Sequence, residues 1–218
     1  MSEVSIVPAV QPDWDAVQLE PMMQALCSYL RAYEARLNAL GSELLGVLPG
    51  LPSLGSFAGD GPLWLREILM PQVVPAGAFL RTGNRLGVLP PTMLRRVLAV
   101  RGLYAMRSAV RRCIDRAKLE QLREAIGEAS LVALRQSAVT DGETMQALPE
   151  SLDAKALVAA GLEIMQHDGS IDIPGVWHLI VLQIVGTPTT VPLHATEPNA
   201  ETLRFLSSVT ALIPELTW

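Results

Sequence analysis

Residues 91–114, with the sequence PTMLRRVLAVRGLYAMRSAVRRCI, carry the feature that most narrowly constrains the fold of this chain. Their apolar side chains recur at steps of three and four residues, with one longer step across Gly102: Leu94, Val97, Leu98, Leu103, Met106, Val110 and Ile114. This spacing is typical of one face of an α-helix. The arginines fall mostly between the apolar residues, so the segment is predicted to form an amphipathic helix from Pro91 with one basic side.

The rest of the sequence also favours helices. Half of the 218 residues are hydrophobic but only 5% are aromatic, so the core is expected to consist mainly of Leu, Val, Ala, Ile and Met. Such a composition favours helices over sheets. Further helices are predicted over residues 20–41, 118–138, 151–169 and 199–213, with Ser151 and Asn199 as the N-caps of the last two. Residues 175–186 are a continuous apolar run that fits either a buried helix or a strand, and their helical neighbours favour the helix.

The predicted fold is therefore all-α, a single irregular helical domain over residues 1–218 with long loops rich in Pro and Gly. Residues 1–12 and 46–62 are expected to be flexible because Pro, Gly or Ser interrupt them. The N-terminus has no signal-peptide pattern and no run of eighteen apolar residues occurs, so we expect a cytosolic protein that is not inserted into a membrane. Cys27 and Cys113 are expected to be buried, reduced thiols.

Charge is unevenly distributed along the chain. The net charge is −5, yet residues 81–135 hold twelve basic and four acidic side chains, a net charge of +8. The segments before and after them carry net charges of −5 and −8. Such an asymmetry predicts either that the acidic flanks fold against the basic segment or that the basic segment contacts a partner.

Three interpretations of the basic segment stay open. The acidic flanks could neutralise it, helped by Arg111–Asp115 and Arg116–Glu120 pairs at helical spacing. It could instead form a face that docks on another protein, for which the candidate partner-binding residues are Arg107, Arg111, Arg112, Arg116 and Tyr104. Nucleic-acid binding is the third interpretation, but stacking aromatics are scarce there and the chain as a whole is acidic.

The sequence contains no recognisable catalytic, cofactor-binding or metal-binding pattern. It has no HExxH or phosphate-binding loop sequence, and its three histidines, His167, His178 and His194, are scattered over separate elements. We therefore predict no catalytic residue, no cofactor and no metal, and a protein that is not an enzyme. One alternative to this prediction is an enzyme whose active site is formed by histidines and carboxylates that are distant in the sequence.

Two stretches resemble the SctK (YscK-like) family of bacterial type III secretion systems. In RGLYAMRSAVRRCIDRAKLEQL, a leucine-rich helix leads to paired arginines and a cysteine, Arg111 to Cys113, and then to a Leu/Gln-rich segment, Leu119 to Leu122. In LPESLDAKALVAAGLEIM, a Leu-Pro step at residues 148–149 opens a helix with a small-residue core at Ala159 to Gly161. The resemblance covers roughly residues 85–165.

The resemblance implies a function. SctK-like proteins are helical, non-enzymatic accessory proteins of the sorting platform. It implies a cytosolic adaptor at the cytosolic face of the inner membrane, which links the cytoplasmic domain of an SctD-like inner-membrane ring protein to an SctQ-like pod protein. An SctL-like stator is a third implied partner. The alternative from the residues alone is a nucleic-acid-associated regulatory protein that uses the basic central helix.

Overall fold

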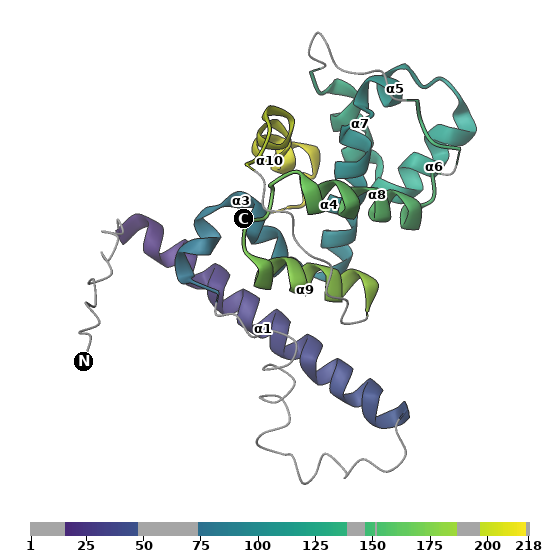
Figure 1. The fold of residues 1–218 in the computed structure, drawn as a ribbon. Coiled ribbons are helices and arrows are strands. Elements are labelled where there is room, and N and C mark those ends of the chain that lie inside the picture. The colour runs from purple at the N-terminus through teal and green to yellow at the C-terminus, as the bar shows by residue number, and fades with distance from the viewer. Residues whose placement is uncertain (1–15, 48–73, 139–146, 151, 187–196, 217–218) are drawn as a thin grey trace, which may run out of the picture.

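The computed structural model describes residues 16–47, 74–138, 147–150, 152–186 and 197–216, and all of its regular elements are helical (Figure 1). In chain order the elements are α1 (Ala16–Val47), the 3₁₀ turn η2 (Ala76–Leu80), α3 (Thr82–Arg85), the 3₁₀ turn η3 (Leu86–Val88), α4 (Pro91–Tyr104), α5 (Arg107–Arg112), α6 (Arg116–Ile126), α7 (Glu128–Gln136), α8 (Ala154–His167), α9 (Pro174–Val185) and α10 (Ala200–Leu212). The all-α prediction is confirmed, and residues 175–186 lie in a helix.

Helix α4 lies at the centre of the fold. All eight of its residues from Val97 to Tyr104 are buried, because α6, α7, α8, α9 and α10 pack around it. The prediction of a helix with an exposed basic side is therefore wrong for this half of the segment. A helix that is surrounded on all sides has no solvent-facing side on which an arginine such as Arg101 could lie.

Helices α4 and α8 cross in direct backbone contact at two glycines. A Cβ atom on Gly161 would lie 1.9 Å from the Leu98 carbonyl oxygen, and one on Gly102 would lie 2.9 Å from the Leu157 carbonyl oxygen. Both distances are too short for real atoms, so the crossing needs glycine at these positions. Gly161 belongs to the small-residue segment singled out in the sequence, and its role is to bring α8 against the central helix.

The predicted helix over residues 91–114 is interrupted. It ends as α4 at Tyr104, turns at Ala105 and Met106, and resumes as α5. The guanidinium of Arg107 donates a 2.7 Å hydrogen bond to the Tyr104 carbonyl, which is one of the carbonyls that a helix leaves without a partner at its end. The turn redirects the chain, so the second half of the basic segment does not continue the face of α4.

Several helix boundaries differ from the predicted ones. Helix α1 begins before Pro21 and continues past Gly41 to Val47, whereas α6 and α7 are separated at Gly127, which adopts φ +83°. This positive φ favours glycine, and the backbone conformation at Gly127 is not helical, so the helix ends there. Helix α10 is capped by Asn199 as predicted, with a 2.8 Å hydrogen bond from the Thr202 amide. Cys27 is exposed, contrary to prediction, and Cys113 is buried.

The connection between α8 and α9, residues 168–173, docks on the turns that precede α4. Gly83 abuts the Ser170 carbonyl so closely that an added Cβ would lie 1.6 Å from its oxygen. The buried Asn84 side chain donates to the Ala78 carbonyl at 2.8 Å and to Asp172 at 2.6 Å. These hydrogen bonds satisfy an amide that would be costly to bury alone, and they fix the connection beside α4.

Some predictions concern residues outside those described. They are the flexibility of residues 1–12 and of nearly all of 46–62. The prediction of Ser151 as the N-cap of the following helix is wrong, because α8 begins at Ala154 and is capped by Asp153, which accepts a 2.8 Å hydrogen bond from the Ala156 amide. Gly46 and Val47, at the start of the predicted flexible loop, are the last two residues of α1. Among the described helices, none is both long and apolar enough to span a membrane.

The glycine crossing can be tested with Gly161→Ala. The added methyl group must push α8 away from α4, and overpacking of this kind costs roughly 1–3 kcal/mol even where alanine is the better helix former. We expect a loss of this size in urea unfolding followed by circular dichroism. Ala159→Ser, at an exposed position of the same helix, is expected to change stability by less than about 0.5 kcal/mol. Unchanged stability of Gly161→Ala would contradict the close crossing.

Candidate functional site

The five predicted partner-binding residues divide into two groups. Arg107 and Tyr104 are buried, with 1% and 5% of their surface exposed. Arg111, Arg112 and Arg116 are exposed, at the end of α5 and the start of α6. The expectation that Arg107 and Arg111 share an open face is therefore corrected, and only the three exposed arginines remain available for partner contact.

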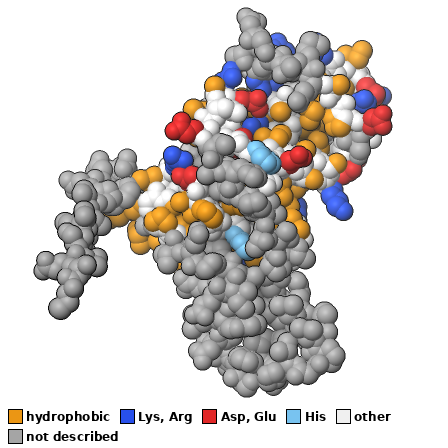
Figure 2. Space-filling view, in the orientation of Figure 1, with side chains coloured by type: hydrophobic (Ala, Val, Ile, Leu, Met, Phe, Trp, Pro, Cys, Tyr) orange, Lys and Arg blue, Asp and Glu red, His pale blue; other side chains and the backbone are white. Residues whose placement is uncertain are grey.

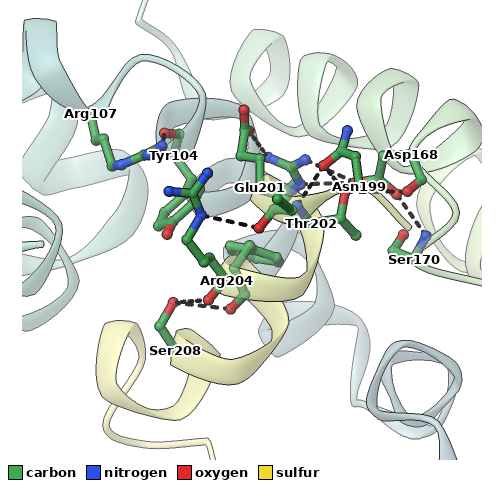
Figure 3. A network of polar contacts seen from close by, with 12 residues as sticks. Tyr104, Arg107, Asp168, Ser170, Asn199, Glu201, Thr202, Arg204 and Ser208 are labelled. Carbon is green, nitrogen blue, oxygen red and sulfur yellow. Dashed lines mark hydrogen bonds and ion pairs between the residues drawn. The ribbon is translucent and has the colours of Figure 1, made fainter. Parts of the chain in front are cut away.

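Arg107 is held in the interior by carbonyl groups and an aromatic ring. Besides the Tyr104 carbonyl, its Nε donates to the Ala138 carbonyl at 3.2 Å. Its guanidinium lies over the Tyr104 ring, 4.2 Å from the ring centroid (Figure 3). Burial lowers the pKa of the Arg107 guanidinium from its ordinary value, but arginine stays protonated in proteins. The arrangement therefore stabilises a buried cation and fastens the start of α5 to the end of α4.

Arg101, which sequence reasoning did not single out, forms the central ion pairs of the fold. Its side chain is 2% exposed. Its Nε and Nη2 both donate to Asp168 Oδ2, at 3.1 and 2.9 Å, and Nη1 donates to Glu201 Oε1 at 2.9 Å. Three helices are thereby joined, because Asp168 directly follows α8 and Glu201 lies in the first turn of α10. A carboxylate in that first turn also interacts favourably with the helix dipole.

The groups around this ion-pair network are themselves hydrogen-bonded (Figure 3). The second oxygen of Asp168 accepts from the Ser170 amide at 2.8 Å, and the Thr202 hydroxyl donates to the Asp168 carbonyl at 3.2 Å. The Arg101 guanidinium also lies 5.2 Å from the centroid of the Phe205 ring. Charges removed from water need such additional partners for their burial to be tolerated.

Internal neutralisation accounts for part of the basic segment. Besides Arg101, further arginines of the segment form ion pairs with carboxylates. Arg96 pairs with Glu215 at 3.3 Å, and Arg123 pairs with Glu120 and Glu128. Asp168, Glu201 and Glu215 all belong to the acidic C-terminal segment, so that flank folds against the basic segment as one interpretation predicted. The charge asymmetry was the signal for this packing, although it could not identify the individual pairs.

Of the three exposed arginines, neither Arg111 nor Arg116 has a carboxylate partner among the described residues. The predicted Arg111–Asp115 and Arg116–Glu120 pairs do not form among the described residues. Asp115 instead accepts hydrogen bonds from the Ala117 and Lys118 amides, at 2.9 and 3.3 Å, and caps α6. Charged side chains gather on the upper part of the face in Figure 2, where Figure 1 places α5 to α7. This end of the molecule thus presents guanidinium groups to solvent.

The same arrangement disfavours the nucleic-acid interpretation. Arg101 and Arg107 are withdrawn from the surface, so the basic stripe is interrupted. Tyr104 is packed edge-on against Phe205, with 5.4 Å between the ring centroids. Because its side chain is buried and the Arg107 guanidinium lies over its ring, it has no free face on which a base could stack. No observation in the described part of the chain favours nucleic-acid binding over protein binding.

Other potential sites show no convergent chemistry. His167 is exposed at the end of α8, His178 is half-buried in α9, where burial lowers its pKa, and His194 lies outside the described residues. Among the residues that the structure describes, no group of three or more His, Cys, Asp or Glu side chains could hold a metal ion. An acidic hollow of about 460 Å³ lies beside α6 and includes Asp153, but that side chain caps α8.

Comparison with known proteins identifies a family. Residues 70–215 match the family described as bacterial type III secretion protein (HrpB4). The matched region contains α4 to α10, the buried Arg101 network and the three exposed arginines, whereas α1 lies before it. No curated protein and no solved structure matches the chain.

The buried network can be tested with Asp168→Ala. The change leaves the Arg101 guanidinium inside the protein with only Glu201 as a carboxylate partner, and loss of one partner of a buried pair costs about 3–5 kcal/mol. We expect a loss near the lower end of that range in chemical unfolding followed by tryptophan fluorescence. Glu215→Ala removes the exposed partner of Arg96 and is expected to cost at most about 1 kcal/mol. Equal losses for the two variants would refute the central role of Arg101.

The division between buried and exposed arginines predicts a contrast between two charge reversals. Arg107→Glu would place a carboxylate against carbonyl oxygens in the interior, so we expect a loss of about 3 kcal/mol or more. Arg111→Glu changes an exposed side chain and is expected to alter stability by less than about 0.5 kcal/mol. Thermal unfolding of the two variants beside the unmodified chain measures the contrast, and similar melting temperatures would contradict the burial of Arg107.

Proposed function

Because the chain belongs to the HrpB4 family of bacterial type III secretion proteins, we propose that it is a non-enzymatic adaptor of the secretion machinery. In this proposal it links the cytoplasmic domain of an SctD-like inner-membrane ring protein to an SctQ-like pod protein of the sorting platform. An SctL-like stator is a third proposed partner. The protein would act in the cytoplasm and, when assembled, at the cytosolic face of the inner membrane.

The observation that carries the proposal is the exposed basic surface at the α5–α6 turn. Arg111, Arg112 and Arg116 lie within the family-matched region and at the surface, whereas Arg101 and Arg107 are buried. Guanidinium groups form directional, charge-assisted hydrogen bonds with carboxylates. A surface of this kind supports protein recognition through complementary charge.

The proposed mechanism is docking without a chemical step. Complementary charges speed the encounter and select the register in which two proteins meet, whereas buried apolar contacts supply most of the affinity. The interior pairs of Arg101 and the glycine crossing of α4 and α8 keep the surface arginines on a rigid support. Rigidity lowers the conformational entropy lost on binding.

Co-purification tests the proposed function. The full chain, tagged at its N-terminus and expressed in a type III-secreting cell, is expected to recover both the pod protein and the ring protein in moderate salt. The triple variant Arg111→Glu, Arg112→Glu, Arg116→Glu is expected to recover at least one of them less well, because the reversed charges repel an acidic partner surface. Arg107 is left unchanged because its replacement would destabilise the fold.

Two outcomes would contradict the adaptor proposal. One is recovery of neither protein by a chain that is folded, as judged by its circular dichroism spectrum. The other is recovery of nucleic acid in place of proteins, with binding that weakens steeply as salt is raised. If the unmodified chain and the triple variant recover both proteins at equal yield, the adaptor role stands, but the three arginines do not contribute to binding.

A further inference from the structure

Ile114 is the most exposed large hydrophobic side chain among the described residues. It is 94% exposed, whereas the next, Leu203, is 55% exposed. The sequence pattern had placed Ile114 at the end of the apolar stripe that begins at Leu94. The interruption of the helix overturns that placement, because residues 113–115 belong to the turn between α5 and α6.

The neighbours of Ile114 hold it in this exposed position. Cys113 follows α5 with an extended backbone and points inward, with 9% of its surface exposed. Consecutive side chains of an extended chain point to opposite sides, so Ile114 points outward. The next residue, Asp115, is fixed as the cap of α6. The exposed side chain is thus presented by a turn that is anchored on both sides.

Positive charge surrounds this side chain. Arg111 and Arg112 precede it in the last turn of α5, and Arg116 follows it as the first residue of α6. Neither Arg111 nor Arg116 has a carboxylate partner in the described part of the chain, and the Nε of Arg112 donates to the Ser108 carbonyl at 3.1 Å. We call Ile114 and these three arginines the Ile114 knob.

We propose that the Ile114 knob is the docking element of this protein, and that it inserts into an apolar pocket with an acidic rim on a partner protein. The inference rests on the proposed function, since the partner is sought among the proteins that the adaptor links. The isoleucine supplies affinity through burial of its apolar surface. The arginines pair with carboxylates at the rim, and they exclude water from the centre of the contact.

Charge complementarity identifies the kind of occupant. Three guanidinium groups around one aliphatic side chain match a pocket lined by apolar residues and rimmed by Asp or Glu. An anionic membrane fits less well, because the acidic Asp115 lies among the four basic side chains of residues 111–118, a number at the lower end of the four to eight that membrane-binding segments generally contain. A single isoleucine is also a small anchor for a bilayer compared with the apolar face of an amphipathic helix. A protein surface therefore accounts for both features of the knob.

The test measures dissociation constants of the full chain for two probes, the purified pod protein and the purified cytoplasmic domain of the ring protein. Ile114→Ser is expected to weaken binding to one probe about ten- to hundredfold, the range that follows from burying one isoleucine. Ile114→Leu keeps the apolar surface and is expected to restore most of the affinity. Leu203→Ser, on α10, is the matched control and is expected to leave both dissociation constants unchanged.

Charge variants test the rim of the pocket. The double variant Arg111→Glu, Arg116→Glu is expected to weaken binding to the same probe by roughly tenfold or more and to make binding less sensitive to salt, because screening acts on exposed charge pairs. Circular dichroism and thermal unfolding of every variant are expected to match those of the unmodified chain. The readout is therefore binding and not folding.

Several outcomes would overturn the inference. If the unmodified chain binds a probe and Ile114→Ser binds it equally well, the docking role of the Ile114 knob is refuted, while the adaptor function stands. If the unmodified chain binds neither probe, the adaptor function fails and the knob fails with it. Binding of vesicles that contain phosphatidylserine, lost in Ile114→Ser while protein binding is unchanged, would assign the knob to a membrane. Self-association of the chain that depends on Ile114, seen by sedimentation, would assign it to a second copy.

Discussion

The arrangement of the helices depends on the ion pairs that the buried guanidinium of Arg101 forms. A cation at the centre of a surrounded helix must find carboxylates inside the protein, because its burial without them is prohibitive. Asp168 and Glu201 meet this demand from the end of α8 and the start of α10. Both elements are therefore brought to one place on α4. The glycine crossing lets α8 approach closely enough for Asp168 to reach Arg101.

One sequence feature, the density of arginines between residues 95 and 116, thus serves two different purposes. Arg101 and Arg107 face packed helices, and they are engaged by carboxylates, carbonyl groups and aromatic rings. Beyond Arg107 the chain has turned at Ala105 and Met106, and the arginines reach the surface. The turn separates the residues that hold the fold together from those available to a partner, and it also brings Ile114 out of the apolar stripe.

Local signals in the sequence predicted much of the fold. The helical class and the cap at Asn199 follow from apolar spacing and capping chemistry, which depend on near neighbours. The apolar run over residues 175–186 fitted a helix or a strand equally well, and only its helical neighbours favoured the helix that is found. The break after Tyr104 and the burial of Arg107 did not follow. Both depend on contacts between residues distant in the sequence, such as Arg107 with the Ala138 carbonyl. Spacing alone places Arg107 and Arg111 on one face, and it could not show that one is buried and the other exposed.

Hydrogen–deuterium exchange of the full chain, measured with and without saturating pod protein or ring-protein cytoplasmic domain, tests the central claim most directly. The account predicts that one partner slows exchange in residues 107–118, while α4 and α8, which lie outside the proposed docking surface, show little change. Slowed exchange confined to α1 or α9, with residues 107–118 unaffected by either partner, would contradict it. The docking surface would then lie elsewhere, and the exposed arginines and Ile114 would need another explanation.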